Sequence, residues 1–353
     1  MEKIIFIYPK RASFIDLDIN ILSKNYFVIE NTYNWINKHT LPLALLNQFF
    51  FILKNIRASK YLVVSFGGYW SIIPSLLGKW FKKPVFIILH GSDCVSFKEI
   101  NYGSLRKPIL RFILKKSYEL ATHLLPVSQS LIYTENNYYS KNRTISQGYK
   151  YFFDKNNTKN TVIHNAVDSN RWCIQPNIKR NNNRFITVLS EGQFIRKGGE
   201  LIIDIAYKLP EFEFFFIGIL KPLSLSNAPN NITFIPKTPP DELLKIYNGA
   251  KYYLQLSIFE GFGVALCEAM SSGCIPIVSN ANILPYIIGE TGYVITHNDS
   301  DILEKKLIEI HNENNAEMGR KARKRIIENF SVEKRANKLY EVLDKGRIIY
   351  KKN

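Results

Sequence analysis

Cysteine is scarce in this sequence of 353 residues, which contains only four. No two of them form a C-x-x-C pair, and no histidine lies at zinc-finger spacing from them. This spacing excludes a disulfide-stapled miniature fold and a cysteine-rich zinc site. We expect reduced and mostly buried thiols at Cys94, Cys173, Cys267 and Cys274.

Long hydrophobic runs are also missing. The longest apolar stretch, residues 41–56, is interrupted by Asn47 and Gln48 and falls short of the roughly 20 residues that span a bilayer. The N-terminus leads directly into a short apolar segment, without the basic region and long apolar region of a secretory signal. We therefore expect a cytoplasmic protein that touches the inner face of a membrane at most peripherally.

Negative charge is in short supply. The sequence holds 47 Lys and Arg against 30 Asp and Glu, a formal net charge of +17. Such an excess favours a polyanionic partner, which can be nucleic acid, an anionic membrane or a phosphate-bearing substrate. The sequence has no helix-turn-helix, zinc-finger or RNA-recognition signature, and its basic residues are spread out, so we expect no nucleic-acid binding.

Short apolar runs alternate with longer helix-like segments along the chain. Continuous β-branched and aromatic runs are typical of strands buried on both faces, and so of parallel sheets covered by helices. Two series of such runs predict an α/β protein with two doubly wound, Rossmann-like domains. The predicted strands are residues 3–8, 61–65, 85–89, 124–127 and 161–164 in the first series, and 185–190, 212–217, 232–235, 252–255 and 275–278 in the second.

A polar, Asn-rich segment near residues 168–183 separates the two series. We therefore predict an N-terminal domain over residues 1–172 and a C-terminal domain over residues 173–330. The basic and acidic pattern of residues 331–353 predicts a helix that packs back towards the N-terminal domain.

Residues 257–280 are the most informative segment for function. Their pattern predicts a strand, a glycine loop, a helix that ends at a glycine, and a second strand. Gly261 and Gly263 allow a tight turn and a close approach of the backbone to a ligand. A helix that starts at Val264 would offer its unpaired N–H groups and its positive dipole end to a phosphate.

Two carboxylates frame this loop, Glu260 before it and Glu268 in the second turn of the helix. A carboxylate accepts hydrogen bonds well from vicinal hydroxyls, such as those of a ribose and a sugar on either side of a diphosphate. The spacing fits a nucleotide-sugar site, and it fits equally well a generic Rossmann turn with two solvated glutamates.

The same segment resembles the E-x7-E signature of the group 1 (family 4) glycosyltransferases, through residues 260–263, 268–270, 273–279 and 288–293. The resemblance implies a retaining enzyme of GT-B architecture, whose two Rossmann-like domains face a cleft and bind acceptor and nucleotide-sugar respectively. It also implies that Glu260 contacts the donor hexose and Glu268 the ribose. The diphosphate would be held by the backbone of Gly261, Phe262, Gly263 and Val264.

Residues 162–168 and 189–198 resemble the segments that close the first domain and open the second in the same family. The resemblance implies that Lys197 neutralises the donor diphosphate, whose departure needs positive charge in place of a metal. The family's arginine position holds Gln193 here. Arg196 is a candidate to replace that arginine; otherwise the leaving group is stabilised less, or an arginine comes from elsewhere.

His90 and Asp93 follow the predicted strand 85–89 and resemble the family's H-G-x-D. By pattern alone a histidine in this place is more often structural. The resemblance implies that His90 lies near the donor sugar, and it leaves Asp93 as a donor-site residue or a helix N-cap.

The loop after the first strand lacks the Gly-Gly turn that is common in the family. Lys10, Arg11 and Ser13 lie there, and we expect them to reach the donor or a phosphorylated acceptor.

Two triplets, Asp16 to Asp18 and Asp299 to Asp301, match the D-x-D pattern with which metal-dependent transferases hold a cation. Both look like acidic first turns of helices, a position that the helix dipole favours. We therefore expect no catalytic metal and no cofactor besides the donor.

The segment from Leu105 to Ser117 predicts a helix opened by Pro108, with basic side chains along one face. The basic residues are Lys107, Arg111 and Lys115, and the predicted buried stripe is Ile109, Leu110, Ile113 and Leu114. One interpretation is an ordinary Rossmann helix with its basic side in water. The alternative is a patch that contacts anionic lipid.

These observations predict a metal-independent retaining glycosyltransferase that moves a hexose from a UDP- or GDP-sugar to a glycan or polyprenyl-linked acceptor, in cell-surface polysaccharide biosynthesis. Two alternatives remain on the same fold, a nucleotide-sugar 2-epimerase and a non-catalytic glycan- or nucleotide-binding homologue. Glycoside hydrolysis by the paired carboxylates fits less well, because a hydrolase needs no diphosphate site.

Overall fold

The computed structural model describes residues 1–351 except 36, 38, 141, 223–224 and 226. The chain divides into two compact units. The first comprises Met1–Thr134, Ser146–Ala166 and Val332–Asn353, and the second comprises Glu135–Ile145 and Val167–Ser331. Residues 135–145 and 167–172, which the sequence placed in the N-terminal domain, therefore belong to the second unit.

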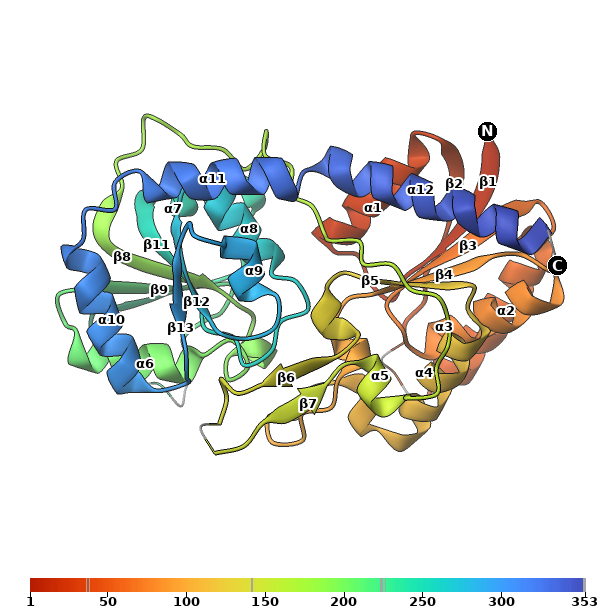
Figure 1. Ribbon diagram of the computed structural model, residues 1–353, viewed down its shortest axis with the longest axis horizontal. Coiled ribbons are helices and arrows are strands. Elements are labelled where there is room, and N and C mark those ends of the chain that lie inside the picture. The colour runs from red at the N-terminus through yellow and green to blue at the C-terminus, as the bar shows by residue number, and fades with distance from the viewer. Residues whose placement is uncertain (36, 38, 141, 223–224, 226, 352–353) are drawn as a thin grey trace. The chain divides into compact units, whose positions relative to one another are not determined.

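The first unit is built on a five-stranded parallel sheet with the order β2-β1-β3-β4-β5 (Figure 1). Its strands are β1 (Glu2–Ile7), β2 (Tyr26–Asn31), β3 (Ser59–Ser65), β4 (Val85–Leu89) and β5 (His123–Pro126). Strand β4, in the interior of the sheet, is buried along its whole length, which explains its uninterrupted apolar run. Strand β2 lies at the edge and is only partly buried.

The helices of the first unit form two groups. Helices α1 (Ser13–Ser23) and α12 (Val332–Lys351) contact each other. Helices α2 (Leu41–Ile56), α3 (Tyr69–Trp80) and α4 (Pro108–Leu120) pack side by side in that order, on the opposite face of the sheet (Figure 1). The short helix α5 (Tyr149–Phe152) also belongs to this unit, whereas the two-stranded sheet of β6 (Thr134–Asn136) and β7 (Ile145–Gln147) contains residues of both units.

The predicted strand over residues 161–164 was wrong. These residues run beside β5, where the N–H groups of Thr161 and Ile163 donate to the carbonyls of Leu124 and Pro126. Among the described residues here, only the preceding Asn160 forms a β-bridge, with Leu124, so residues 161–164 do not form a strand.

The second unit is built on a six-stranded parallel sheet with the order β10-β9-β8-β11-β12-β13. Its strands are β8 (Asn181–Val188), β9 (Glu213–Ile217), β10 (Ile232–Ile235), β11 (Ala250–Gln255), β12 (Ile275–Ser279) and β13 (Tyr293–Ile295). Its helices are α6 (Gly199–Lys208), α7 (Pro240–Gly249), α8 (Val264–Ser271), α9 (Leu284–Ile288), α10 (Ser300–Asn312) and α11 (Met318–Asn329).

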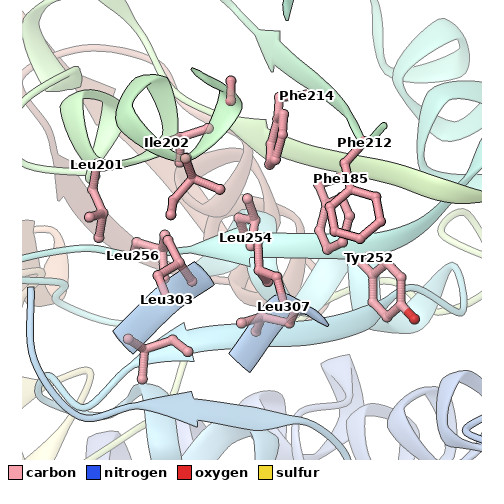
Figure 2. Close-up of a cluster of buried hydrophobic side chains, with 14 of the residues drawn as sticks. Phe185, Leu201, Ile202, Phe212, Phe214, Tyr252, Leu254, Leu256, Leu303 and Leu307 are labelled. Atoms are coloured by element: carbon pink, nitrogen blue, oxygen red, sulfur yellow. The ribbon is translucent and has the colours of Figure 1, made fainter. Parts of the chain in front are cut away.

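Stacked aromatic rings and helix leucines form the core of the second unit (Figure 2). The ring of Phe185 lies 4.7 Å from that of Tyr252 and 5.5 Å from that of Phe214, centroid to centroid. Leu303 and Leu307 of α10 belong to the same cluster.

All four cysteines of the chain are free. Cys94, Cys267 and Cys274 are buried and Cys173 is half-buried, which confirms the expectation of reduced and mostly buried thiols.

A buried ion pair joins the two helices α1 and α12. The guanidinium of Arg335 donates to both carboxylate oxygens of Asp18, over 2.6 and 2.7 Å. Its Nη1 also donates to the carbonyls of Ile163 and His164, so each of its three nitrogens has a hydrogen-bond partner. Both side chains are at most 1% exposed, so the D-x-D residue Asp18 is a structural counter-ion.

Asp18→Ala should lower the free energy of unfolding of the first unit by about 3–5 kcal/mol, because it leaves a buried guanidinium without its counter-charge. Asp16 lies on the same helix as Asp18 and forms a half-exposed ion pair with Arg11. Asp16→Ala should therefore change the free energy of unfolding little. Urea unfolding followed by tryptophan fluorescence measures both, since three of the four tryptophans lie in this unit. Equal effects of the two substitutions would contradict the assignment.

Candidate functional site

A glycine turn starts helix α8 in the second unit. Gly263 has φ 101° and is the residue immediately before the helix, in the left-handed region that favours glycine. The helix therefore begins at Val264, as the sequence predicted. The N–H groups of its first turn point out of the helix end, where a phosphate would find both donors and the positive end of the dipole.

Glu260 is held in this turn by three donors. Its Oε2 accepts hydrogen bonds from Gln255 Nε2 at 3.1 Å and from Ser257 Oγ and Arg196 Nη1 at 3.3 Å. Burial alone would raise the pKa of Glu260, but the charges of Arg196 and Lys197 outweigh it and lower the pKa. Glu260 is therefore a carboxylate at neutral pH.

Arg196 and Lys197 lie under the same turn. The backbone carbonyl of Arg196 accepts a hydrogen bond from the N–H of Ile258 at 2.8 Å. The Nη1 of Arg196 donates to the carbonyl of Phe259 at 2.7 Å. Lys197 Nζ donates to the carbonyl of Val188 at 3.0 Å. Burial lowers the pKa of Lys197, and the charge of Glu260 partly offsets that effect. The structure thus brings together two cations that the sequence predicted for one site.

Glu268 projects from the second turn of α8 and is 9% exposed. Burial raises its pKa to about 7, although the hydroxyl of Tyr247, at 3.5 Å, and the charge of Lys197 act in the opposite direction. Because Glu260 and Glu268 are both largely buried, the alternative of two solvated glutamates is wrong.

Gln193 does not take the place of an arginine beside Glu260. It ends the 3-10 turn Glu191–Gln193, and its Oε1 accepts the N–H of Ser190 at 3.2 Å. Its side chain is therefore engaged by its own turn, and Arg196 is the cation that reaches Glu260.

His90 follows β4 in the first unit and is enclosed by aromatic rings. Its ring centroid lies 4.3 Å from that of Phe66 and 4.8 Å from that of Phe14, and its Nε2 is 3.0 Å from Ser65 Oγ. Burial, followed by the charge of Arg335, holds the pKa of His90 well below 6.5. The imidazole is therefore neutral at physiological pH.

Asp93 is completely buried. Its carboxylate accepts the N–H groups of Gly67 and Gly91 at 2.8 Å and of His90 at 3.2 Å. It lies inside the short turn Ser92–Cys94 and is no N-cap. The carboxylate ties the loop after β3 to the loop after β4, so the expected contact of its side chain with a donor does not agree with its burial.

The three residues predicted on the acceptor side differ in their surroundings. Arg11 forms ion pairs with Asp16 at 2.5 Å and Glu30 at 2.6 Å. Lys10 and Ser13 are exposed, and Ser13 is the first residue of α1.

The other D-x-D carboxylates are also engaged. The Asp299 side chain caps α10 by accepting the N–H groups of Asp301 and Ile302, and Asp301 pairs with Lys208 at 2.5 Å. Within the described ranges, no group of three or more His, Cys, Asp or Glu is placed to hold a metal ion.

Several residues that support the turn were missed by the sequence analysis. Gln255 and Ser257 hold the carboxylate of Glu260, and Asn282 Oδ1 accepts its N–H at 3.2 Å. Asn136 Nδ2 donates to the carbonyl of Ile258 at 2.6 Å from 122 residues away in the sequence. No local pattern marks Asn136, because its role depends on the tertiary fold.

Comparison with known proteins identifies this domain. Residues 170–331 match the family described as glycosyl transferases group 1. This part of the chain belongs to the group 1 glycosyltransferases. Among curated relatives, O-antigen chain mannosyltransferase B of Escherichia coli is 32% identical over 78 residues, and trehalose synthase of Pyrococcus horikoshii is 37% identical over 95 residues. These matches cover 22% and 26% of this chain, and 20% and 22% of the relatives' own lengths.

Solved structures extend the likeness to nearly the whole chain. Sucrose-phosphate synthase from Thermosynechococcus elongatus superposes with a TM-score of 0.76 at 14% identity, over 98% of this chain and 99% of the other. The Anabaena protein HepE, solved in complex with UDP-glucose, gives 0.71 at 13% identity, over 97% and 99%. This likeness shows that the chain has the GT-B fold.

The raised pKa of Glu268 predicts a pH dependence of nucleotide binding. Below pH 7 its carboxyl is largely protonated in the unliganded protein, and only the carboxylate accepts from two ribose hydroxyls. Affinity for a nucleoside diphosphate should thus rise with pH, by at most about tenfold per unit below pH 7, and level off above it.

Isothermal titration calorimetry with UDP and GDP measures this effect, and Glu268→Gln is the matched control. Titration of the phosphate is common to both proteins and cancels in the comparison. If the substituted protein shows the same pH profile as the wild type, Glu268 does not bind the ribose.

Proposed function

We propose that this protein is a retaining glycosyltransferase that moves a hexose from a nucleotide-diphosphate sugar to a glycan or polyprenyl-linked acceptor. The observation that carries the proposal is the arrangement in the second unit. A helix N-terminus lies between two largely buried carboxylates and beside two buried cations. Phosphate, hydroxyl groups and negative leaving-group charge are the ligands that such an arrangement suits.

In this proposal each group has one task. The diphosphate binds at the start of α8, against the backbone of residues 261–264. Glu268 accepts hydrogen bonds from the ribose hydroxyls, and Glu260 accepts them from the hexose. His90, as a neutral imidazole, is proposed to contact the donor sugar. The UDP-glucose bound to HepE and the mannosyl transfer in the name of the E. coli relative support a hexose donor.

The proposed reaction needs no catalytic metal. The acceptor oxygen bonds to the anomeric carbon on the side from which the nucleotide leaves, while the bond between that carbon and the diphosphate oxygen breaks. The acceptor proton passes to a phosphate oxygen of the departing nucleoside diphosphate. Arg196 and Lys197 stabilise the charge that develops there.

Proton NMR of the protein with UDP-, GDP- and ADP-sugars, in EDTA and without acceptor, should show slow release of nucleoside diphosphate from one donor. We expect Glu268→Ala to abolish this release, because the ribose loses its acceptor. A new epimer of the sugar nucleotide would instead identify an epimerase, and dependence on added divalent cations would exclude the metal-free reaction.

Lys197→Met keeps the length of the side chain and removes its charge. We expect kcat to fall by about 10²–10³, with a smaller change in KM, because the charge matters most as the diphosphate leaves. The matched control is Lys208→Met, at the far end of α6, where the lysine pairs with Asp301 on the surface. A similar kcat for both variants would remove Lys197 from the proposed mechanism.

A further inference from the structure

Helix α2 carries apolar side chains on its outer face as well as on its inner one. The residues buried against the sheet are Ala44, Gln48, Ile52 and Ile56. The outward residues are Leu43, Leu46, Phe50 and Leu53, which are 59%, 52%, 58% and 38% exposed. Their spacing of three, four and three places them on one stripe. A helix that is apolar all round is expected to have both faces covered.

The neighbouring helices extend this stripe. Helix α3 exposes Leu76 and Trp80, and helix α4 exposes Ile109 and Phe112. Trp80 and Ile109 are 71% and 72% exposed. Because α3 packs against both α2 and α4, these side chains and those of α2 share one surface, which we call the apolar helix face.

The position of Ile109 corrects a sequence prediction. Ile109 was expected in the buried stripe of α4, but Leu110 and Leu114 fill the space against the unit, at 8% and 0% exposure. Ile109 and Phe112 therefore lie outside, between the basic residues Lys107, Arg111, Lys115 and Lys116.

The charges around the apolar helix face are almost all positive. No Asp or Glu occurs from Asn31 to Ser92, a segment that contains seven Lys and Arg. Helix α4 adds one acidic residue, Glu119, which pairs with Lys116 at 2.9 Å. The exposed basic residues of α2, α3 and their C-terminal ends are Lys54, Arg57, Lys79 and Lys82.

We propose that the apolar helix face docks on an anionic membrane, with its apolar side chains at the acyl boundary and its basic side chains among the headgroups. Apolar groups inside a cationic rim match the two layers of such a surface. A second copy of the chain would bring the same positive rim against itself, which like-charge repulsion disfavours. In the described part of the chain, no helix is long and apolar enough to cross a bilayer.

Flotation with phosphatidylcholine vesicles, with and without phosphatidylglycerol, tests the proposal. We expect binding to the anionic vesicles, weakened by salt, and little binding to the neutral ones. The triple variant Phe50→Ser, Trp80→Ser, Phe112→Ser should have an affinity for anionic vesicles lower by about tenfold or more. Replacing Lys54, Lys79 and Arg111 by Gln should lower this affinity by about fivefold per charge.

The control replaces three other exposed apolar residues, Phe27, Tyr207 and Ile308, which lie outside the apolar helix face, by serine. This control should bind like the wild type. Emission of Trp80 should shift to the blue on anionic vesicles, and Trp80→Phe should lose the shift while it keeps binding.

Two outcomes would overturn the proposal. One is no flotation at low salt. The other is a dimer, measured by light scattering, that the triple variant converts to a monomer, because the occupant would then be a second copy. The proposed nucleotide site lies in the other unit, so nucleotide binding should be unchanged in the variants of the apolar helix face. Failure of the membrane proposal is therefore distinguishable from failure of the proposed function.

Discussion

Four ionisable groups are buried together under one glycine turn, and the chemistry of the second unit depends on the balance of their charges. Arg196 and Lys197 hold Glu260 as a carboxylate, whereas burial brings the pKa of Glu268 to about 7. These four side chains together therefore carry slightly more positive than negative charge at neutral pH. A low-dielectric site with unbalanced positive charge attracts an anion, and a diphosphate at the start of α8 completes the compensation.

The residues of this site could be predicted because their chemistry is local. Gly263, Glu260 and Glu268 lie within nine residues, and a glycine turn before a helix has few structural solutions. Burial could not be predicted, because it depends on strands that are distant in sequence. The sequence pattern of two glutamates eight residues apart is the same whether their side chains are exposed to water or buried. The partners of Gln193 and Asp93 were missed for the same reason, since backbone N–H groups leave no mark in a sequence.

The fold was predictable where strands are buried on both faces. Strands β4 and β12 are buried along their whole length and begin where the predicted runs begin, whereas the partly buried edge strand β2 and the three-residue edge strand β13 were missed. Helix α4 shows the other limit. Its periodicity predicted that Ile109 is buried together with Leu110 and Leu114. The apolar stripe of the helix is wider than the surface available to bury it, and the packing of α4 against α3 leaves Ile109 exposed.

The ion pair between Asp18 and Arg335 joins residues 317 positions apart. A ribosome that adds about 5–20 residues per second needs about 15–60 s to travel that distance. During this interval the first unit exists with a carboxylate whose buried counter-ion has not yet been made. The second unit, whose last residue is Ser331, is complete before α12 emerges. The ribosome therefore begins the first unit before the second one but completes it after the second one.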